Sequence, residues 1–153
     1  MTKVEVVEQL MQMQRKIADL IVLLEDEKEE FSKPVNPKVE LKKVVTNELS
    51  KLGYPMNIQG FAYVRTAILM VMENPEMIQS ITKQLYPSVA CQYHTTSSKV
   101  ERSIRHGIER TFDKGNMEQL NRIFGYVCSM DKGKTTNSEF IATLAERIRL
   151  QLN

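Results

Sequence analysis

The chain has no tryptophan, only two cysteines and no apolar run long enough to cross a bilayer. A membrane-spanning helix takes roughly 20 consecutive apolar residues, and the longest candidate here covers only residues 67–72. Cys91 and Cys128 lie far apart in the sequence, and no secretory signal pattern accompanies them. Because a lone pair of distant thiols does not indicate a disulfide framework, we expect reduced cysteines, no membrane partner and a cytoplasmic location.

The sequence also lacks the motifs of common enzyme classes. It holds no glycine-rich phosphate loop, no HExxH and no GxSxG. Neither histidine, His94 or His106, has a nucleophile and an acid arranged around it. Cys91 and His94 are three residues apart, but two ligands do not make a structural zinc site, which takes four. We therefore expect a protein that is not an enzyme and has no catalytic residues, metal or cofactor.

What the sequence does contain is helical periodicity. Apolar residues recur at intervals of three and four, and no segment alternates with the period of two that marks a strand. The predicted helices cover about 3–31, 38–52, 61–72, 87–94, 98–114, 116–124 and a last segment from Thr136 onward. Residues 126–135 are predicted to be a polar loop, and Thr136 with Glu139 predicts a capping box at the start of the last helix. The predicted fold class is therefore all-α.

The first of these helices repeats its apolar residues by heptads. With Leu10 at position a, the a and d positions from residue 6 to 31 are apolar except Glu27: Val6, Leu10, Met13, Ile17, Leu20, Leu24 and Phe31. Nearly four heptads favour a coiled coil, although the extra apolar residues 21–23 leave open a helix packed on its own domain. We expect residues 1–32 to be a coiled-coil dimerisation helix that makes a homodimer. The seam residues expected to hold two chains together are Leu10, Ile17, Leu20 and Leu24.

Two prolines, Pro34 and Pro37, interrupt the pattern after this helix. Proline lacks an N–H and restricts the residue before it, so residues 33–40 are predicted to be a linker and 41–153 a separate domain. The charges follow the same division. Residues 1–40 hold six basic against nine acidic side chains, and residues 41–153 hold fifteen against ten. An acidic N-terminal segment thus precedes a basic domain.

Residues 85–112 predict two helices joined by a short polar turn. Pro87 suits the first turn of a helix, the hydroxyl residues 95–98 can cap the next one, and Val100, Ile104 and Ile108 recur on one face of it. The opposite face and its flanks carry Ser98, Lys99, Arg102, Arg105, His106 and Glu109. This pattern is typical of a helix-turn-helix, although many charged helix faces are simply solvated. The full prediction is a multi-helix domain containing a helix-turn-helix after an N-terminal coiled coil.

Several longer motifs point to one family. ITKQLYPSVA, TTSSKVERSIRHGIE, IFGY and TNSEFIA follow one another in the order that family shows. From about Val44 to Leu150, the chain resembles the effector domain of stage zero sporulation protein A, the sporulation response regulator of endospore-forming bacteria. The resemblance implies a sequence-specific, double-stranded-DNA-binding transcription regulator whose target box is similar to TGTCGAA. It also implies contact with the RNA polymerase sigma subunit, around Arg110 to Phe112 and Met117 to Phe124, where agreement with the family is weaker.

The family carries a phosphoacceptor receiver domain that roughly thirty helical residues cannot supply, because a receiver needs alternating strands and helices over about 120 residues. We therefore expect DNA binding that is independent of phosphorylation, with the coiled coil replacing the receiver as the dimerisation device.

The second helix of the pair supplies the expected DNA contacts. Arg102 can donate two hydrogen bonds to a guanine, and Glu101 can accept one from a cytosine amino group. The resemblance favours that role for Glu101 over a capping box with Ser98. Lys99 stands where the family has arginine and is a third candidate for base contact, without the planar fork. The expected phosphate contacts are Ser97, Ser98, Arg105 and His106. Lys132 and Lys134, in a later loop, either contact phosphates too or are solvated.

A second function of another class stays open at this point. The chain could be an adaptor whose coiled coil captures a full-length relative and modulates its activity. Measuring mixed-dimer formation with such a relative would discriminate the two.

Overall fold

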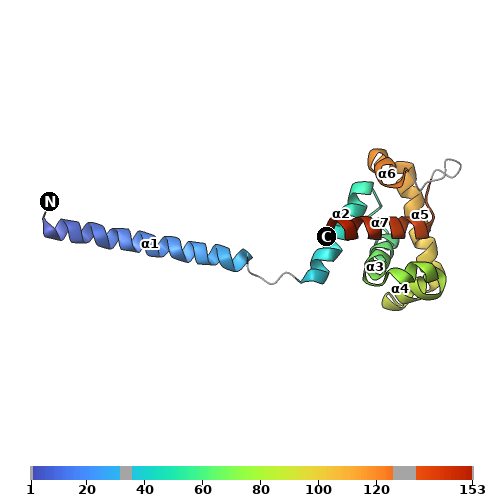
Figure 1. Ribbon diagram of the computed structural model, residues 1–153, viewed down its shortest axis with the longest axis horizontal. Coiled ribbons are helices and arrows are strands. Elements are labelled where there is room, and N and C mark those ends of the chain that lie inside the picture. The colour runs from blue at the N-terminus through green and yellow to red at the C-terminus, as the bar shows by residue number, and fades with distance from the viewer. Residues whose placement is uncertain (1, 32–35, 126–133, 153) are drawn as a thin grey trace. The chain divides into compact units, whose positions relative to one another are not determined.

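The computed structural model describes residues 2–31, 36–125 and 134–152, and of residues 25–31 it describes the backbone alone. Every regular element in these ranges is helical, which confirms the all-α prediction (Figure 1). Contacts divide the chain into two compact units, Met1–Asn36 and Pro37–Asn153.

The first unit is one long helix, α1, which spans Lys3–Phe31. Thr2 and Glu5 form a capping box at its start: the Glu5 N–H donates to the Thr2 hydroxyl, and the Thr2 N–H donates to the Glu5 carboxylate, each at 3.3 Å. The predicted seam residues of this helix are all exposed, Leu10 by 55% and Ile17 by 56%. A helix that exposes such side chains along its length gains little from burial by itself, since helical stability in proteins comes mainly from packing.

The second unit contains the remaining elements: α2 (Pro37–Leu52), α3 (Gln59–Glu73), a 3₁₀ turn η1 (Pro75–Ser80), a π turn η2 (Ile81–Leu85), α4 (Tyr86–Gln92), α5 (Ser97–Lys114), α6 (Met117–Phe124) and α7 (Asn137–Leu152). The predicted linker at 33–40 is wrong at its C-terminal end, because residues 37–40 already belong to α2. Pro37 begins this helix rather than breaking it, since its missing N–H would have no partner in the first turn anyway. Residues 33–35 of that linker lie outside the described residues.

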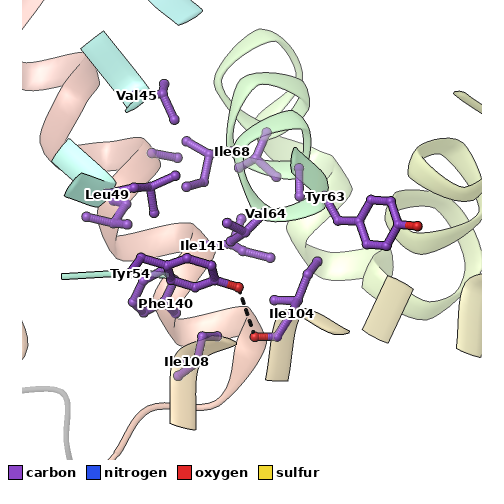
Figure 2. Packing of buried hydrophobic residues seen from close by; sticks show 14 of the residues in the cluster. Val45, Leu49, Tyr54, Tyr63, Val64, Ile68, Ile104, Ile108, Phe140 and Ile141 are labelled. Atoms are coloured by element: carbon purple, nitrogen blue, oxygen red, sulfur yellow. Dashed lines mark hydrogen bonds between the residues drawn. The ribbon is translucent and has the colours of Figure 1, made fainter. Parts of the chain in front are cut away.

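Helix α3 is the centre of the core and contacts α2, α4, α5 and α7. Val64 and Ile68 of α3 are fully buried and meet Leu49 of α2, Ile104 of α5 and Ile141 of α7 in one cluster (Figure 2). Burying each such side chain stabilises the fold by about 1.5–3 kcal/mol relative to leaving it in water. The core therefore holds α5 from behind and leaves its other face to solvent.

The N-terminus of α7 confirms the predicted capping box. The Glu139 N–H donates to the Thr136 hydroxyl, and the Thr136 N–H donates to the Glu139 carboxylate, each at 3.2 Å. Of the polar loop predicted before this helix, residues 126–133, and with them Cys128 and Lys132, lie outside the described residues.

Candidate nucleic-acid interface

A tight turn at residues 93–96 joins α4 to α5. The His94 N–H donates to the Cys91 carbonyl at 3.4 Å and the Thr95 N–H to the Ala90 carbonyl at 2.9 Å. These are the two bonds of a Schellman motif, in which the residue after the helix cap takes a left-handed conformation. His94 does so, with φ 54°. The motif ends α4 abruptly, so that α5 can start in a new direction only a few residues later.

The N-terminal cap of α5 is Thr96. Its side-chain oxygen accepts a hydrogen bond from the Lys99 N–H at 3.2 Å, and its own backbone is extended. The alternative capping box between Ser98 and Glu101 is wrong, because Ser98 already lies inside the helix and the Glu101 carboxylate pairs with Arg105 instead.

Behind α5, Tyr54 fixes how closely the helix approaches the core. The buried Tyr54 hydroxyl donates to the Ile104 carbonyl of α5 at 3.2 Å (Figure 2). The Gly60 carbonyl of α3, at 3.3 Å, shares the same hydroxyl hydrogen. Burial raises the pKa of Tyr54. A Cβ atom at Gly107 would overlap the Tyr54 hydroxyl, so α5 can sit at this depth only with glycine there.

Asn137, the first residue of α7, ties both helices of the pair to the body of the domain. Its side-chain amide donates to the Tyr86 hydroxyl of α4 at 3.0 Å and to the Glu101 carbonyl of α5 at 3.1 Å. Burial of Tyr86 raises its pKa, and the bond from Asn137 opposes that rise. Sequence reasoning missed this role, although Asn137 lies in the TNSEFIA motif. On the other side, the Tyr93 hydroxyl is 2.7 Å from the Thr66 hydroxyl of α3.

The structure gathers the predicted contact residues on the outer side of the N-terminal half of α5. The exposed ones are Ser98, Lys99, Arg102, Arg105 and His106, and the partly buried ones are Ser97 and Glu101. The predicted inner face is confirmed, since Val100, Ile104 and Ile108 are buried. One helix therefore presents four cationic or titratable basic groups to solvent from a firmly packed base.

Glu101 and Arg105 form an ion pair on this surface. Arg105 Nη1 donates to Glu101 Oε1 at 2.9 Å, one helical turn away. Half-exposed pairs of this spacing contribute only about 0.3–0.5 kcal/mol, so either partner can leave it for a stronger contact. Lys99 and Arg102 have no ion-pair partner within the described ranges, which leaves their donors available.

Lys134 has a partner in the domain. Its ammonium donates to Glu109 Oε1 of α5 at 2.9 Å, and this bond holds the pKa of the Glu109 carboxyl below its usual range. The sequence predicted either a phosphate contact or a solvated side chain for Lys134, and did not consider an ion pair within the domain. This pair attaches the segment just before α7 to α5.

The region after α5 is partly buried. Thr111 is fully buried, and its hydroxyl donates to the Gly107 carbonyl at 2.7 Å. The Phe112 ring packs on Phe124 of α6 with centroids 5.8 Å apart. Of the predicted sigma-contact region, Arg110, Met117, Glu118 and Arg122 are exposed, whereas Thr111 is not available at the surface.

The described residues contain no group of three His, Cys, Asp or Glu side chains that could hold a metal ion. They also contain no helix that is both long and apolar enough to cross a membrane.

Residues 45–148 match the family model described as sporulation initiation factor Spo0A C terminal. The chain belongs to this family. The match covers α3 to α6 completely, the C-terminal half of α2 and most of α7, whereas α1 lies outside it. The Spo0A C-terminal family is one of DNA-binding effector domains rather than enzymes, so this unit is a DNA-binding effector domain of the kind that regulates transcription in sporulation. The resemblance drawn from the sequence motifs is thereby confirmed.

Proposed function

We propose that the chain is a sequence-specific transcription regulator that binds its DNA box through α5, without phosphorylation, as a homodimer joined by α1. The observation that supports the DNA contact is the exposed cationic face of α5 on a base fixed by Tyr54 and Asn137. A rigid base matters because base readout depends on side chains being held in register with the groove.

Within this proposal, Lys99, Glu101 and Arg102 contact base edges. Lys99 and Arg102 are exposed and three residues apart on one helix face, as neighbouring contacts in a major groove require. Glu101 accepts from a cytosine amino group once Arg105 turns from the carboxylate to a phosphate. Ser97, Ser98, Arg105 and His106 then hold phosphates along the groove edges.

The test is binding by Arg102→Ala to a DNA fragment carrying the box and to a scrambled fragment of equal length. Loss of a bidentate base contact should weaken specific binding by about 1–3 kcal/mol and relax the preference at one position. Arg122→Ala is the matched control, because Arg122 is an exposed arginine on α6 that pairs with Glu118 one turn away. Equal losses on both fragments for Arg102→Ala would remove Arg102 from the base contacts.

Homodimer formation rests on the exposed heptad seam of α1. Leu10, Ile17, Leu20 and Leu24 are each more than half exposed in the single chain. Two such seams bury one another in a coiled coil, which would bring two effector domains together without a phosphorylation signal. Sedimentation of the unphosphorylated chain at micromolar concentration should give a dimer, and a monomer would contradict this part of the proposal.

The same exposed seam supports a second candidate function, in which the chain is an adaptor that pairs with a full-length relative. Mixed dimers that form as readily as homodimers would favour it. Contact with the RNA polymerase sigma subunit stays a proposal for the exposed residues of α6, which are Met117, Glu118, Asn121 and Arg122.

A further inference from the structure

We infer that two copies of α1 pair antiparallel, in a register that places residue 10 of one copy opposite residue 20 of the other. The inference rests on the proposed homodimer and adds to it the direction and register of the helices. It comes from the distribution of apolar and charged residues along α1.

The charges of α1 are divided unequally between its two halves. Residues 3–16 hold three basic and two acidic side chains, whereas residues 17–31 hold one basic and six acidic ones. A parallel pair would set the two acidic halves side by side, and like charges at this spacing repel. An antiparallel pair sets each acidic half against the basic half of the other copy. Charge complementarity therefore favours the antiparallel arrangement.

The two polar seam positions give the register. In the heptad frame Lys3 occupies an a position and Glu27 a d position, and both interrupt an otherwise apolar seam. Reversing one helix brings a positions opposite d positions, so one register pairs Lys3 with Glu27 of the second copy at both ends. A shift of one heptad either way would set Lys3 against Leu20 or Glu27 against Leu10. A parallel pair would set lysine against lysine and glutamate against glutamate.

All the other layers of this register are apolar on both sides. They pair Val6 with Leu24, Leu10 with Leu20, and Met13 with Ile17, each twice in the dimer. The flanking e positions bring Val7 of one copy beside Ile21 of the other, and both of these are 49% exposed in the single chain. The antiparallel pair thus covers apolar residues that the a and d seam alone leaves in water.

The direction decides where the two effector domains leave the coil. In this register the two copies of Phe31 lie about 48 Å apart along the axis, at the helical rise of 1.5 Å per residue. A parallel pair would release both chains at the same end. An antiparallel coil therefore suits two boxes separated by more than one helical turn of DNA, about 34 Å.

Disulfide trapping tests direction and register together. Single-cysteine chains Leu10→Cys and Leu20→Cys are made in a background that also carries Cys91→Ser and Cys128→Ser, and are oxidised alone and after mixing. In the inferred register Leu10 faces Leu20, whereas two copies of Leu10 lie about 15 Å apart along the axis, well beyond the roughly 7 Å limit for a disulfide. We expect the mixture to give the cross-linked dimer and each variant alone to stay largely uncross-linked. Arg15→Cys is the matched control, because it lies at the midpoint of the overlap but on the f position, which faces outward.

Each result decides a different point. Cross-linking of Leu10→Cys with itself would overturn the antiparallel direction and leave the proposed homodimer standing. If the chain sediments as a dimer but neither the mixture nor either variant alone cross-links, the register is wrong. A monomer in sedimentation would contradict the homodimer itself, and the inference with it.

Discussion

The two units of this chain treat their apolar side chains in opposite ways. Leu49 in α2 is fully buried, whereas Leu10 in α1 is 55% exposed, although both lie on regular helices with apolar faces. The unit from Pro37 onward buries its apolar side chains in a core around α3, whereas the apolar side chains of α1 are exposed in the single chain. The second unit therefore has a core of its own, whereas in the proposed homodimer α1 would take its stability from the second copy. The family match follows the same division, because it covers only the second unit.

The largest effect is expected when the same change, isoleucine to aspartate, is made separately in each unit. Ile68→Asp puts an unpaired charge into the core of α3, a change of the kind that costs more than about 4–5 kcal/mol, a large share of the stability of an ordinary domain. Ile17→Asp should leave the thermal unfolding of the effector domain unchanged, because Ile17 is exposed in the single chain. Circular dichroism melts of the two variants give the answer. A large drop in the domain's melting temperature for Ile17→Asp would show that α1 packs on its own domain.

A smaller effect, confined to the second unit, is expected from Gly107→Ala. Alanine in place of glycine inside a helix normally stabilises it by up to about 1 kcal/mol. Here the added Cβ would meet the Tyr54 hydroxyl, and overpacking of this kind costs about 1–3 kcal/mol. Denaturant unfolding should therefore show a net loss of stability with no change in oligomeric state.

The control for this prediction is the double variant Tyr54→Leu with Gly107→Ala. Leucine lacks the hydroxyl and the ring atoms Cζ and Cε1 that the added Cβ would overlap, so the cost of Gly107→Ala should be smaller in the Tyr54→Leu background. An equal cost in both backgrounds would mean that the Tyr54 contact is not what requires glycine at position 107.

The smallest effect separates phosphate contacts from base contacts on α5. Arg105→Ala should weaken binding to all sequences alike and reduce the slope of log affinity against log salt by about one unit. Titration of binding against salt for wild type and variant measures this slope. An unchanged slope would show that Arg105 serves only its pair with Glu101.

Local patterns predicted much of this molecule. The length of α1, the buried face of α5 and the capping box of α7 follow from residue spacing within a few turns, and the structure agrees with each. The short elements η1 and η2 did not follow, because six or fewer residues carry too little periodicity to be recognised.

Other features depend on residues that are distant in the sequence. Asn137 reaches Tyr86 and the Glu101 carbonyl across 51 and 36 residues, and no spacing rule contains that information. The left-handed conformation of His94 could not be predicted for a different reason: the residue in this position after a helix is usually glycine, and here it is histidine. Five of the predicted contact residues are exposed because helical spacing turns them away from Ile104 and Ile108: Ser98, Lys99, Arg102, Arg105 and His106. Ser97 and Glu101 lie nearer the buried face and are partly buried.

The most direct test of the whole account is binding by the unphosphorylated chain to DNA with two boxes and with one. Wild type should bind the paired boxes at least roughly tenfold more tightly than the single box, since linking two binding units raises the effective concentration of the second. Ile17→Asp should lose that advantage and keep its affinity for the single box. Equal affinities of wild type for both fragments, or a need for phosphorylation before any binding, would contradict the account.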